Sequence, residues 1–336
     1  MLLELDSDQR FWRDTVRDAL AKECPASLVR AVAEDGADTT ALWQTYVDMG
    51  WTELTDASET VELGLLVEAL GAASDPTPFL ATLTQFSPLA GDRIDAKLSG
   101  AAVYDGVTAA RTADGWVLDG TCRHVLDGDR ADRLAVLTPA GVFILGSDQV
   151  TARRVQVFDP VLHVAEVTLA SVAVPTEARV SGVNVERARE LALTGMALTV
   201  VGSCQRILDL VLEHVGSRKQ FGVLIGSFQA VQHKAADMHV AIERARALAY
   251  FAALTLAEGD PRSRMAAMMA KAGAGECQSL VFKHGVQLFG AMGFTWENDV
   301  QFPLKRAKAG ELMLGGAAEH RARITEESLA AARAGA

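Results

Sequence analysis

The spacing of apolar residues divides the chain into segments of different type. In residues 6–90, apolar side chains recur every three or four positions, which predicts amphipathic helices. Asp6 and Ser7 precede the first of these helices and are candidate N-caps. A later helix is expected to begin near Glu62 and to stop at Gly71, because glycine commonly ends helices. This first segment is therefore predicted to be a bundle of helices.

The period of the apolar residues changes to two between about Leu98 and Pro175, where β-branched residues are frequent. Within this segment, Asp119-Gly120 is a strong signal for the turn of a β-hairpin. We therefore expect a small antiparallel sheet or barrel. Its predicted strands include Trp116–Leu118, Leu134–Leu137, Gly141–Leu145 and Val167–Leu169.

Long helical patterns return from about Asn184 to Ala331, and they are rich in alanine and leucine. Four long helices joined by short loops would form a bundle. They are expected over Glu190–Gly216, Phe228–Gly259, Pro261–Phe289 and after Thr325. The predicted fold class is α+β, mainly α, with an N-terminal helical domain (1–96), a small middle β-sheet or barrel domain (97–180) and a C-terminal four-helix bundle domain (181–336).

Length and charge narrow the classes of protein that fit these segments. A chain of 336 residues exceeds the size at which one hydrophobic core usually stops growing, so two or three packed units are expected. The formal net charge of −11 argues against nucleic acid as a partner, because phosphates require a basic surface.

Cysteine spacing and leader signals point to a cytoplasmic protein. The four cysteines show neither metal-ligand nor disulfide spacing. The N-terminus lacks a basic and apolar leader, and the chain shows no uninterrupted apolar run of about 18 residues. We expect a soluble protein without a metal and without a membrane partner.

Two short motifs on the C-terminal helical pattern carry the candidate chemistry. The first is Arg218-Lys219-Gln220-Phe221-Gly222, which is soon followed by Phe228-Gln229-Ala230-Val231-Gln232-His233. The second is Val286-Gln287-Leu288-Phe289-Gly290-Ala291-Met292-Gly293-Phe294. In this order, with a β-like segment upstream, the motifs resemble those of the acyl-CoA dehydrogenase family. The resemblance covers most of the chain and implies that these segments hold the FAD of a neighbouring subunit.

The resemblance implies a role for each residue of the first motif. The guanidinium of Arg218 would pair with the FAD pyrophosphate, a task that suits a permanently charged planar fork. Gln220 and Phe221 would line the same region, and Phe228 and Gln229 would lie beside the ribityl-adenine portion. The alternative for Arg218 is a solvated loop cation.

The second motif matches the family's glycine-rich segment, where backbone amides approach the dinucleotide. Gln287, Gly290 and Ala291 would contribute to this contact. Ala291 stands where the family usually has glycine, so the approach is expected to be looser or shifted. The alternative is a helix C-terminal turn that needs glycine for its conformation only.

The family's reaction also needs a carboxylate that removes the acyl α-proton while the flavin takes the β-hydride. Counting from Gln287 places this base on Leu314 or Gly315, and the position that some members use instead falls on Ala192. None of these residues can accept a proton. Glu190 is the weak candidate for a displaced base, although it is turned by roughly 200° from Ala192 on a helix.

The flavin-ring side of the family pattern is reduced as well, because its Thr-Glu-Pro…Gly-Ser-Asp loop is shortened here within residues 100–116. The combined pattern resembles the shorter subunit of actinobacterial α2β2 heteromeric acyl-CoA dehydrogenases. In that arrangement, a longer partner chain supplies the base and the flavin-ring contacts, and one FAD binds at each αβ interface.

The resemblance implies α,β-desaturation of an acyl-CoA thioester, such as the CoA ester of a fatty acid or of a steroid side chain. An electron-transfer flavoprotein or another protein would accept the electrons. Two alternatives stay open. One is a self-sufficient homo-oligomeric dehydrogenase that uses Glu190, and the other is a non-catalytic scaffold of the same fold.

Overall fold

The computed structural model describes residues 4–334, which form two compact units. The helical unit contains the residues up to 36, residues 57–75 and the residues from 193 on. The β unit contains residues 37–56 and 76–192. These units cut across the three domains that follow the order of the sequence, and the three-domain division stays a prediction.

The first part of the helical unit is formed by α1 (Ser7–Glu23), α2 (Ala26–Asp35) and α4 (Thr60–Ala73), with a short 3-10 turn before α4 (Ala57–Glu59). Asp6 caps α1, as expected. Its side chain accepts a hydrogen bond from the Gln9 amide (2.8 Å), and the Gln9 side chain accepts one from the Asp6 amide (3.3 Å). This reciprocal pair is a capping box, which satisfies two otherwise unpaired N–H groups.

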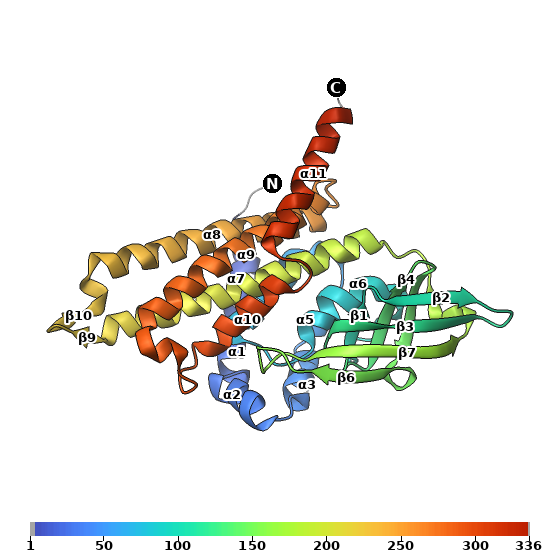
Figure 1. The fold of residues 1–336 in the computed structure, drawn as a ribbon, viewed down its shortest axis with the longest axis horizontal. Helices are drawn as coiled ribbons and strands as arrows, with labels where there is room; N and C mark the ends of the chain where they lie inside the picture. The colour runs from blue at the N-terminus through green and yellow to red at the C-terminus, as the bar shows by residue number, and fades with distance from the viewer. Residues whose placement is uncertain (1–3, 335–336) are drawn as a thin grey trace. The chain divides into compact units, whose positions relative to one another are not determined.

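The remainder of the helical unit consists of long helices (Figure 1), namely α7 (Val185–Ser217, of which residues 193–217 belong to this unit), α8 (Gln229–Ala257), α9 (Ser263–Phe289), α10 (Gln301–Leu312) and α11 (Ala317–Ala334). The predictions for α7, α8 and α9 are confirmed within a few residues. The prediction of four helices was incomplete, because α10 was missed and α11 begins well before Thr325. Helix α9 packs against α8, α10 and α11 and is the centre of the bundle.

Helices α4 and α7 cross at very close range, and two glycines allow this contact. A Cβ atom on Gly71 would collide with the carbonyl of Thr199, and one on Gly202 would collide with the carbonyl of Glu68. The hydroxyl of Ser203 donates to the Gly71 carbonyl at 2.9 Å. The prediction that Gly71 stops the helix was therefore wrong, because this glycine serves packing inside α4. The helix ends instead at Ala73, and its C-cap residue, Ser74, has a positive φ of 56°.

Among the described residues, one helix, α7, has the length and the apolar composition needed to cross a membrane. The most apolar window of α7 is 78% buried inside the protein, as expected for a core helix. A search for an uninterrupted apolar run overlooks this helix because Arg206 and Asp209 interrupt the run.

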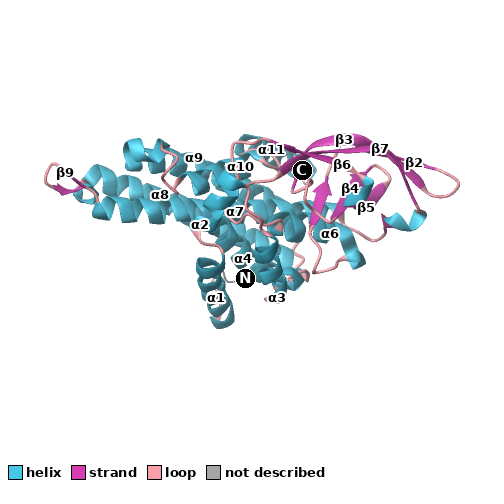
Figure 2. Ribbon diagram, turned by 90° about the horizontal axis from the view of Figure 1, so that it is seen from below, coloured by secondary structure: helices cyan, strands magenta, loops and turns pink. Residues whose placement is uncertain are grey.

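The β unit contains two four-stranded sheets (Figure 2). One sheet has the strand order β1-β4-β5-β8, with β1 (Gly100–Val103), β4 (Arg133–Thr138), β5 (Gly141–Gly146) and β8 (Arg179–Val180). The other has the order β2-β3-β7-β6, with β2 (Val107–Arg111), β3 (Trp116–Leu126), β7 (Val164–Val174) and β6 (Thr151–Val155).

The two sheets share one hydrophobic core, as in packed sheet pairs. Its fully or nearly fully buried members include Ala101, Val103, Leu118, Val125, Leu134, Val136, Phe143 and Val167. The predicted strands lie within β3, β4, β5 and β7. The expectation of a purely antiparallel sheet was wrong in one place, because β1 and β4 pair in parallel.

The β unit also contains several short helical segments. They are α3 (Thr40–Asp48), α5 (Phe79–Ala81), a π-helical turn (Thr82–Phe86), α6 (Ser87–Ala90) and 3-10 turns at Trp51–Glu53, Gly91–Arg93, Ser147–Gln149 and Thr176–Ala178.

Asp119-Gly120 does not form a hairpin turn, so this prediction was wrong. Both residues lie inside β3, where the register with β7 shifts between Leu118 and Gly120. The Asp119 carboxylate accepts hydrogen bonds from the amide (2.8 Å) and the hydroxyl (3.1 Å) of Ser171 on β7. The dipeptide therefore forms a β-bulge, a feature that uses the same residue types as a tight turn.

Candidate functional site

The first motif begins with a small hairpin between α7 and α8. Its strands, β9 (Lys219–Gln220) and β10 (Val223–Leu224), pair in antiparallel register and leave Phe221-Gly222 as the turn. Both turn residues have a positive φ, 53° for Phe221 and 81° for Gly222, as a type I′ turn requires. This conformation is rare for a bulky residue and typically costs about 1–3 kcal/mol.

The strained turn places an aromatic ring at the tip of the hairpin. The Phe221 residue is 93% exposed. Its ring contacts that of Phe228 edge to face, with centroids 6.4 Å apart. The turn therefore combines backbone strain with an exposed apolar ring.

Arg218 joins the end of α7 to this hairpin. Its amide donates to the His214 carbonyl (2.9 Å), and its carbonyl accepts from the Ile225 amide (2.9 Å), so the backbone is fixed on both sides. The guanidinium is exposed and, within residues 4–334, makes no hydrogen bond or ion pair. Burial and the charge of Arg218 lower the pKa of His214. Arg218 therefore presents a cation on a backbone that is fixed on both sides. The alternative that Arg218 is a solvated loop cation stays open.

Phe228 is the N-cap of α8, and its side chain forms no capping hydrogen bond. Its carbonyl accepts from the amides of Val231 (3.0 Å) and Gln232 (3.1 Å). The first N–H groups of α8, at the exposed Gln229 and its neighbour, have no intrahelical acceptor, as at every helix start. An uncapped helix N-terminus attracts anionic oxygens, phosphate in particular.

The second motif lies at the end of α9. Gln287 is exposed, and its side-chain oxygen accepts a short hydrogen bond from the ammonium of Lys234 on α8. Gly290 ends the helix with φ 62° and ψ −140°, a conformation that only glycine adopts readily. Gly290 is thus needed for the conformation of this turn. The close approach of a ligand to its backbone stays a prediction. Ala291 is exposed in the turn that follows.

Side-chain contacts bring these segments together at one end of the helical unit, where Figure 1 shows β9 and β10. The His214 ring on α7 stacks on Phe289 of α9, with centroids 4.7 Å apart. Lys234 joins α8 to α9, and the Phe221 ring joins the hairpin to α8. Sequence reasoning missed Lys234, because nothing in its local pattern shows that it faces Gln287.

The predicted positions of the base do not supply a carboxylate. Leu314 and Gly315 form the turn between α10 and α11 with φ of 58° and 92°. The ammonium of the fully buried Lys271 donates to the carbonyls of Gly315 (2.7 Å) and Glu311 (2.9 Å). His320 donates through Nε2 to the Leu314 carbonyl at 2.9 Å. The two carbonyl groups of this turn therefore accept hydrogen bonds from one buried cation, Lys271, and from the His320 ring.

Nearby carboxylates are engaged elsewhere. Glu311 forms an ion pair with Lys308 (2.8 Å), and Glu319 forms one with Arg323 (2.6 Å). The basic residue Arg306 is buried, and its guanidinium donates to the Asp75 carbonyl at 2.8 Å.

The alternative base position lies in the part of α7 that belongs to the β unit. Ala192 is 1% exposed there, and Glu190 is half-buried with a contact of its own inside the protein. The role of Glu190 stays a prediction.

The chain is similar in sequence to known proteins. Residues 182–329 match the family model of the acyl-CoA dehydrogenase C-terminal domain. The acyl-CoA dehydrogenase IpdE2 of Mycobacterium tuberculosis is 28% identical over 330 residues, which cover 95% of this chain and 97% of that protein.

Solved structures share the fold over nearly the whole chain. A chain of the ChsE4-ChsE5 complex from Mycobacterium tuberculosis superposes with a TM-score of 0.88 at 23% identity, covering 98% of this chain and 99% of that chain. Butyryl-CoA dehydrogenase from Megasphaera elsdenii gives a TM-score of 0.87 at 22% identity, covering 98% of this chain and 100% of that chain. By sequence, residues 182–329 therefore match the acyl-CoA dehydrogenase C-terminal domain, and nearly the whole chain shares the fold of solved acyl-CoA dehydrogenases.

Proposed function

We propose that this chain is a subunit of an FAD-dependent acyl-CoA dehydrogenase that binds the diphosphate end of the cofactor, while a longer partner chain supplies the catalytic base. The observation that carries the proposal is the combination at one end of the helical unit. An exposed arginine, whose guanidinium has no hydrogen-bond or ion-pair partner among residues 4–334, stands beside a strained, exposed hairpin and an uncapped helix N-terminus.

The residues present suit a flavin dinucleotide. The Arg218 guanidinium can form two parallel hydrogen bonds to phosphate oxygens, and the α8 N-terminus adds favourable N–H groups. The Phe221 and Phe228 rings offer apolar faces on which an adenine can stack. Gln220, Gln229 and Gln287 add neutral amide groups, which can donate to phosphate or ribose oxygens without adding negative charge.

Bound FAD would supply the hydride acceptor for α,β-desaturation of the acyl thioester. The side chains of this chain would bind and orient the dinucleotide. Deprotonation at the acyl α-carbon requires a carboxylate, and neither Leu314, Gly315 nor Ala192 can provide one. The absence of a carboxylate at these three positions supports a base from another chain.

The relatives give independent support for a heteromer, because one solved structure of this fold is a complex of two named components, ChsE4 and ChsE5. We infer an α2β2 assembly with one FAD at each αβ interface, acting on an acyl-CoA. An electron-transfer flavoprotein as acceptor, a steroid-type acyl group and a cytoplasmic location are parts of the same proposal.

One expression experiment distinguishes the proposed heteromeric subunit from a self-sufficient homo-oligomer and from a non-catalytic scaffold. The chain is purified alone and after co-expression with a longer acyl-CoA dehydrogenase chain, and flavin absorbance is measured for each. The proposal expects flavin only in the co-purified sample. A yellow protein from this chain alone would favour a homo-oligomer with Glu190 as base. A colourless protein in both samples would favour the scaffold.

A further inference from the structure

Two loops of the β unit meet where the ladder between β3 and β7 ends. The last register pair of this ladder is Leu126 with Val164. Directly beyond it, the Asp127 amide donates to the His163 carbonyl at 2.8 Å. Asp127 has a positive φ of 57°, which turns the chain so that the next residues pass close to His163. The sheet therefore fixes the position of both loops.

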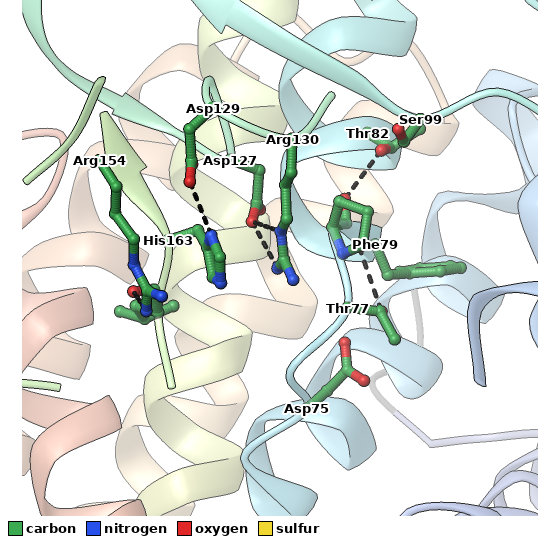
Figure 3. A network of polar contacts seen from close by, with 12 residues as sticks. Asp75, Thr77, Phe79, Thr82, Ser99, Asp127, Asp129, Arg130, Arg154 and His163 are labelled. Atoms are coloured by element: carbon green, nitrogen blue, oxygen red, sulfur yellow. Dashed lines mark hydrogen bonds and ion pairs between the residues drawn. The ribbon is translucent and has the colours of Figure 1, made fainter. Parts of the chain in front are cut away.

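Asp129 and His163 form a hydrogen-bonded pair at this place, as Figure 3 shows. The carboxylate oxygen Oδ2 lies 2.9 Å from Nδ1 of the imidazole. Because a carboxylate only accepts hydrogen bonds, Nδ1 must carry the proton when the imidazole is neutral, and Nε2 then carries a lone pair. No described residue forms a hydrogen bond with Nε2, and the His163 side chain retains 19% exposure.

The side-chain hydrogen bond of Asp129 is the one with His163. The second carboxylate oxygen of Asp129, Oδ1, is buried and has no hydrogen-bond partner among the described residues. Burial opposes ionisation of Asp129, but the hydrogen bond from His163 and the charge of Arg130 hold its pKa below the usual value. Asp129 therefore remains a carboxylate and holds the ring in one tautomer.

The cations of this cluster already have partners. Arg130 binds the buried Asp127 carboxylate through Nε at 2.7 Å and through its terminal nitrogen at 2.5 Å. Burial raises the pKa of Asp127 despite this pair. Arg154 donates to the carbonyls of Pro160 (3.0 Å) and Leu162 (3.2 Å). In the neutral ring, His163 thus offers a hydrogen-bond acceptor at Nε2.

We propose that the Asp129–His163 pair is a ligand subsite, in which Nε2 accepts a hydrogen bond from a hydroxyl group of a bound organic molecule. When neutral, an imidazole backed by a carboxylate favours a proton donor over an anion at Nε2. This inference goes beyond the proposed cofactor contacts, because none of those residues takes part.

The test uses the full chain with isotope-labelled histidine, and NMR reports the tautomer and the Nε2 signal of each ring. Phenol, which carries a hydroxyl group, and anisole, in which that hydroxyl is methylated, serve as matched probes. His124, an exposed histidine of the same unit, is the internal control. His163→Asn and His163→Gln identify the His163 signal by its loss.

The subsite predicts a neutral His163 with the proton on Nδ1, a shift of its Nε2 signal with phenol, and no comparable shift with anisole or at His124. Asp129→Asn should release the tautomer and weaken the phenol response about threefold or more, since the ring loses its orienting charge. A proton on Nε2, no response to phenol, or an equal response to anisole or at His124 would overturn the proposal.

The two His163 variants separate a ligand contact from a purely structural role. Asparagine can keep the donor to Asp129 but lacks an atom at the place of Nε2, whereas glutamine can keep an acceptor there. The subsite predicts that His163→Asn keeps the melting temperature of the wild type but shows no specific binding of phenol over anisole by calorimetry. Retained specific binding in His163→Asn would contradict it.

Discussion

At the scale of single residues, substitution of Arg218 tests the proposed contact with the FAD diphosphate. Arg218→Ala removes a guanidinium without a protein partner, so the fold should be unchanged. The lost charge-assisted phosphate contact is typically worth about 1.5–3 kcal/mol, so the Kd for FAD of the assembled protein should rise about 10- to 150-fold. Release of FAD, followed by its fluorescence, measures this change.

Lys219→Ala is the matched control for Arg218→Ala, because Lys219 is an exposed cation in the same hairpin. Its removal should change the Kd for FAD by no more than about twofold, as for other solvated charges. Equal weakening by both substitutions would mean a general electrostatic effect and would contradict a specific role for Arg218.

Glu190 decides between a base from this chain and a base from a partner. Glu190→Gln keeps the size and polarity of the side chain but removes its ability to accept a proton. If a partner supplies the base, turnover of the active assembly should stay within about threefold, whereas loss of a general base costs about 10²–10⁴-fold. A steady-state kcat that falls by about 10²-fold or more would contradict the proposal that a partner chain supplies the base.

The buried Lys271 gives a prediction for the pH dependence of stability. Burial lowers its pKa to about 8 from 10.5. Between these values the unfolded chain holds the proton and the folded chain does not, so this residue makes the free energy of unfolding rise with pH. Below pH 8, burial of the charged ammonium lowers the free energy of unfolding. This destabilisation decreases as the pH rises from 8 to 10.5.

Lys271→Met removes this titration while keeping the length of the side chain. The free energy of unfolding of the wild type, minus that of the variant, should rise by about 3 kcal/mol between pH 8 and pH 10.5. Urea unfolding at several pH values measures it, and other titrating groups cancel in the difference. A difference that stays flat or falls would show that Lys271 titrates normally.

Residue-scale reasoning from sequence singled out exposed residues of a local motif, such as Arg218 and Phe221, whose cofactor roles stay predictions. It failed for Lys234, Arg306 and Lys271, whose partners come from distant parts of the chain. A basic residue on a helix pattern has the same local sequence whether it is solvated or donates to a buried carbonyl, so only packing decides its role.

At the scale of elements, the crossing of α4 and α7 depends on the absence of side chains. Gly202→Ala would place a methyl group against the Glu68 carbonyl, so the helices must move apart. We expect a loss of about 1–3 kcal/mol in the free energy of unfolding, as for other overpacked sites. Denaturant unfolding of the chain measures it.

Gly216 lies in the same helix and provides the control. A Cβ atom there would meet nothing within 4 Å. Gly216→Ala should therefore be neutral or stabilise by up to about 1 kcal/mol, because alanine favours helix. Similar effects of both substitutions would show that helix propensity, and not the helix crossing, determines the role of Gly202.

Element-scale prediction was best for long periodic segments and weakest for glycine. The periodicity located α7, α8 and α9, and alternation located β4 and β5. Gly71 and Gly120 were misread because a glycine that permits close packing or a bulge has the same sequence signature as one that ends a helix or forms a turn.

At the scale of the whole molecule, the order of helical, β and helical segments was predictable from the changes of period, and the family fold confirms it. The composition of the two compact units was not, because α4 and the residues from 193 on are distant in sequence. Arg218 and Phe221 of the candidate site are exposed, and we propose that another chain completes this site.

Native mass spectrometry of the co-purified assembly tests the central claim most directly. The account predicts a complex of two copies of this chain and two copies of a longer chain, with one FAD for each pair. A complex of this chain alone that carries one FAD per copy and oxidises an acyl-CoA would contradict it.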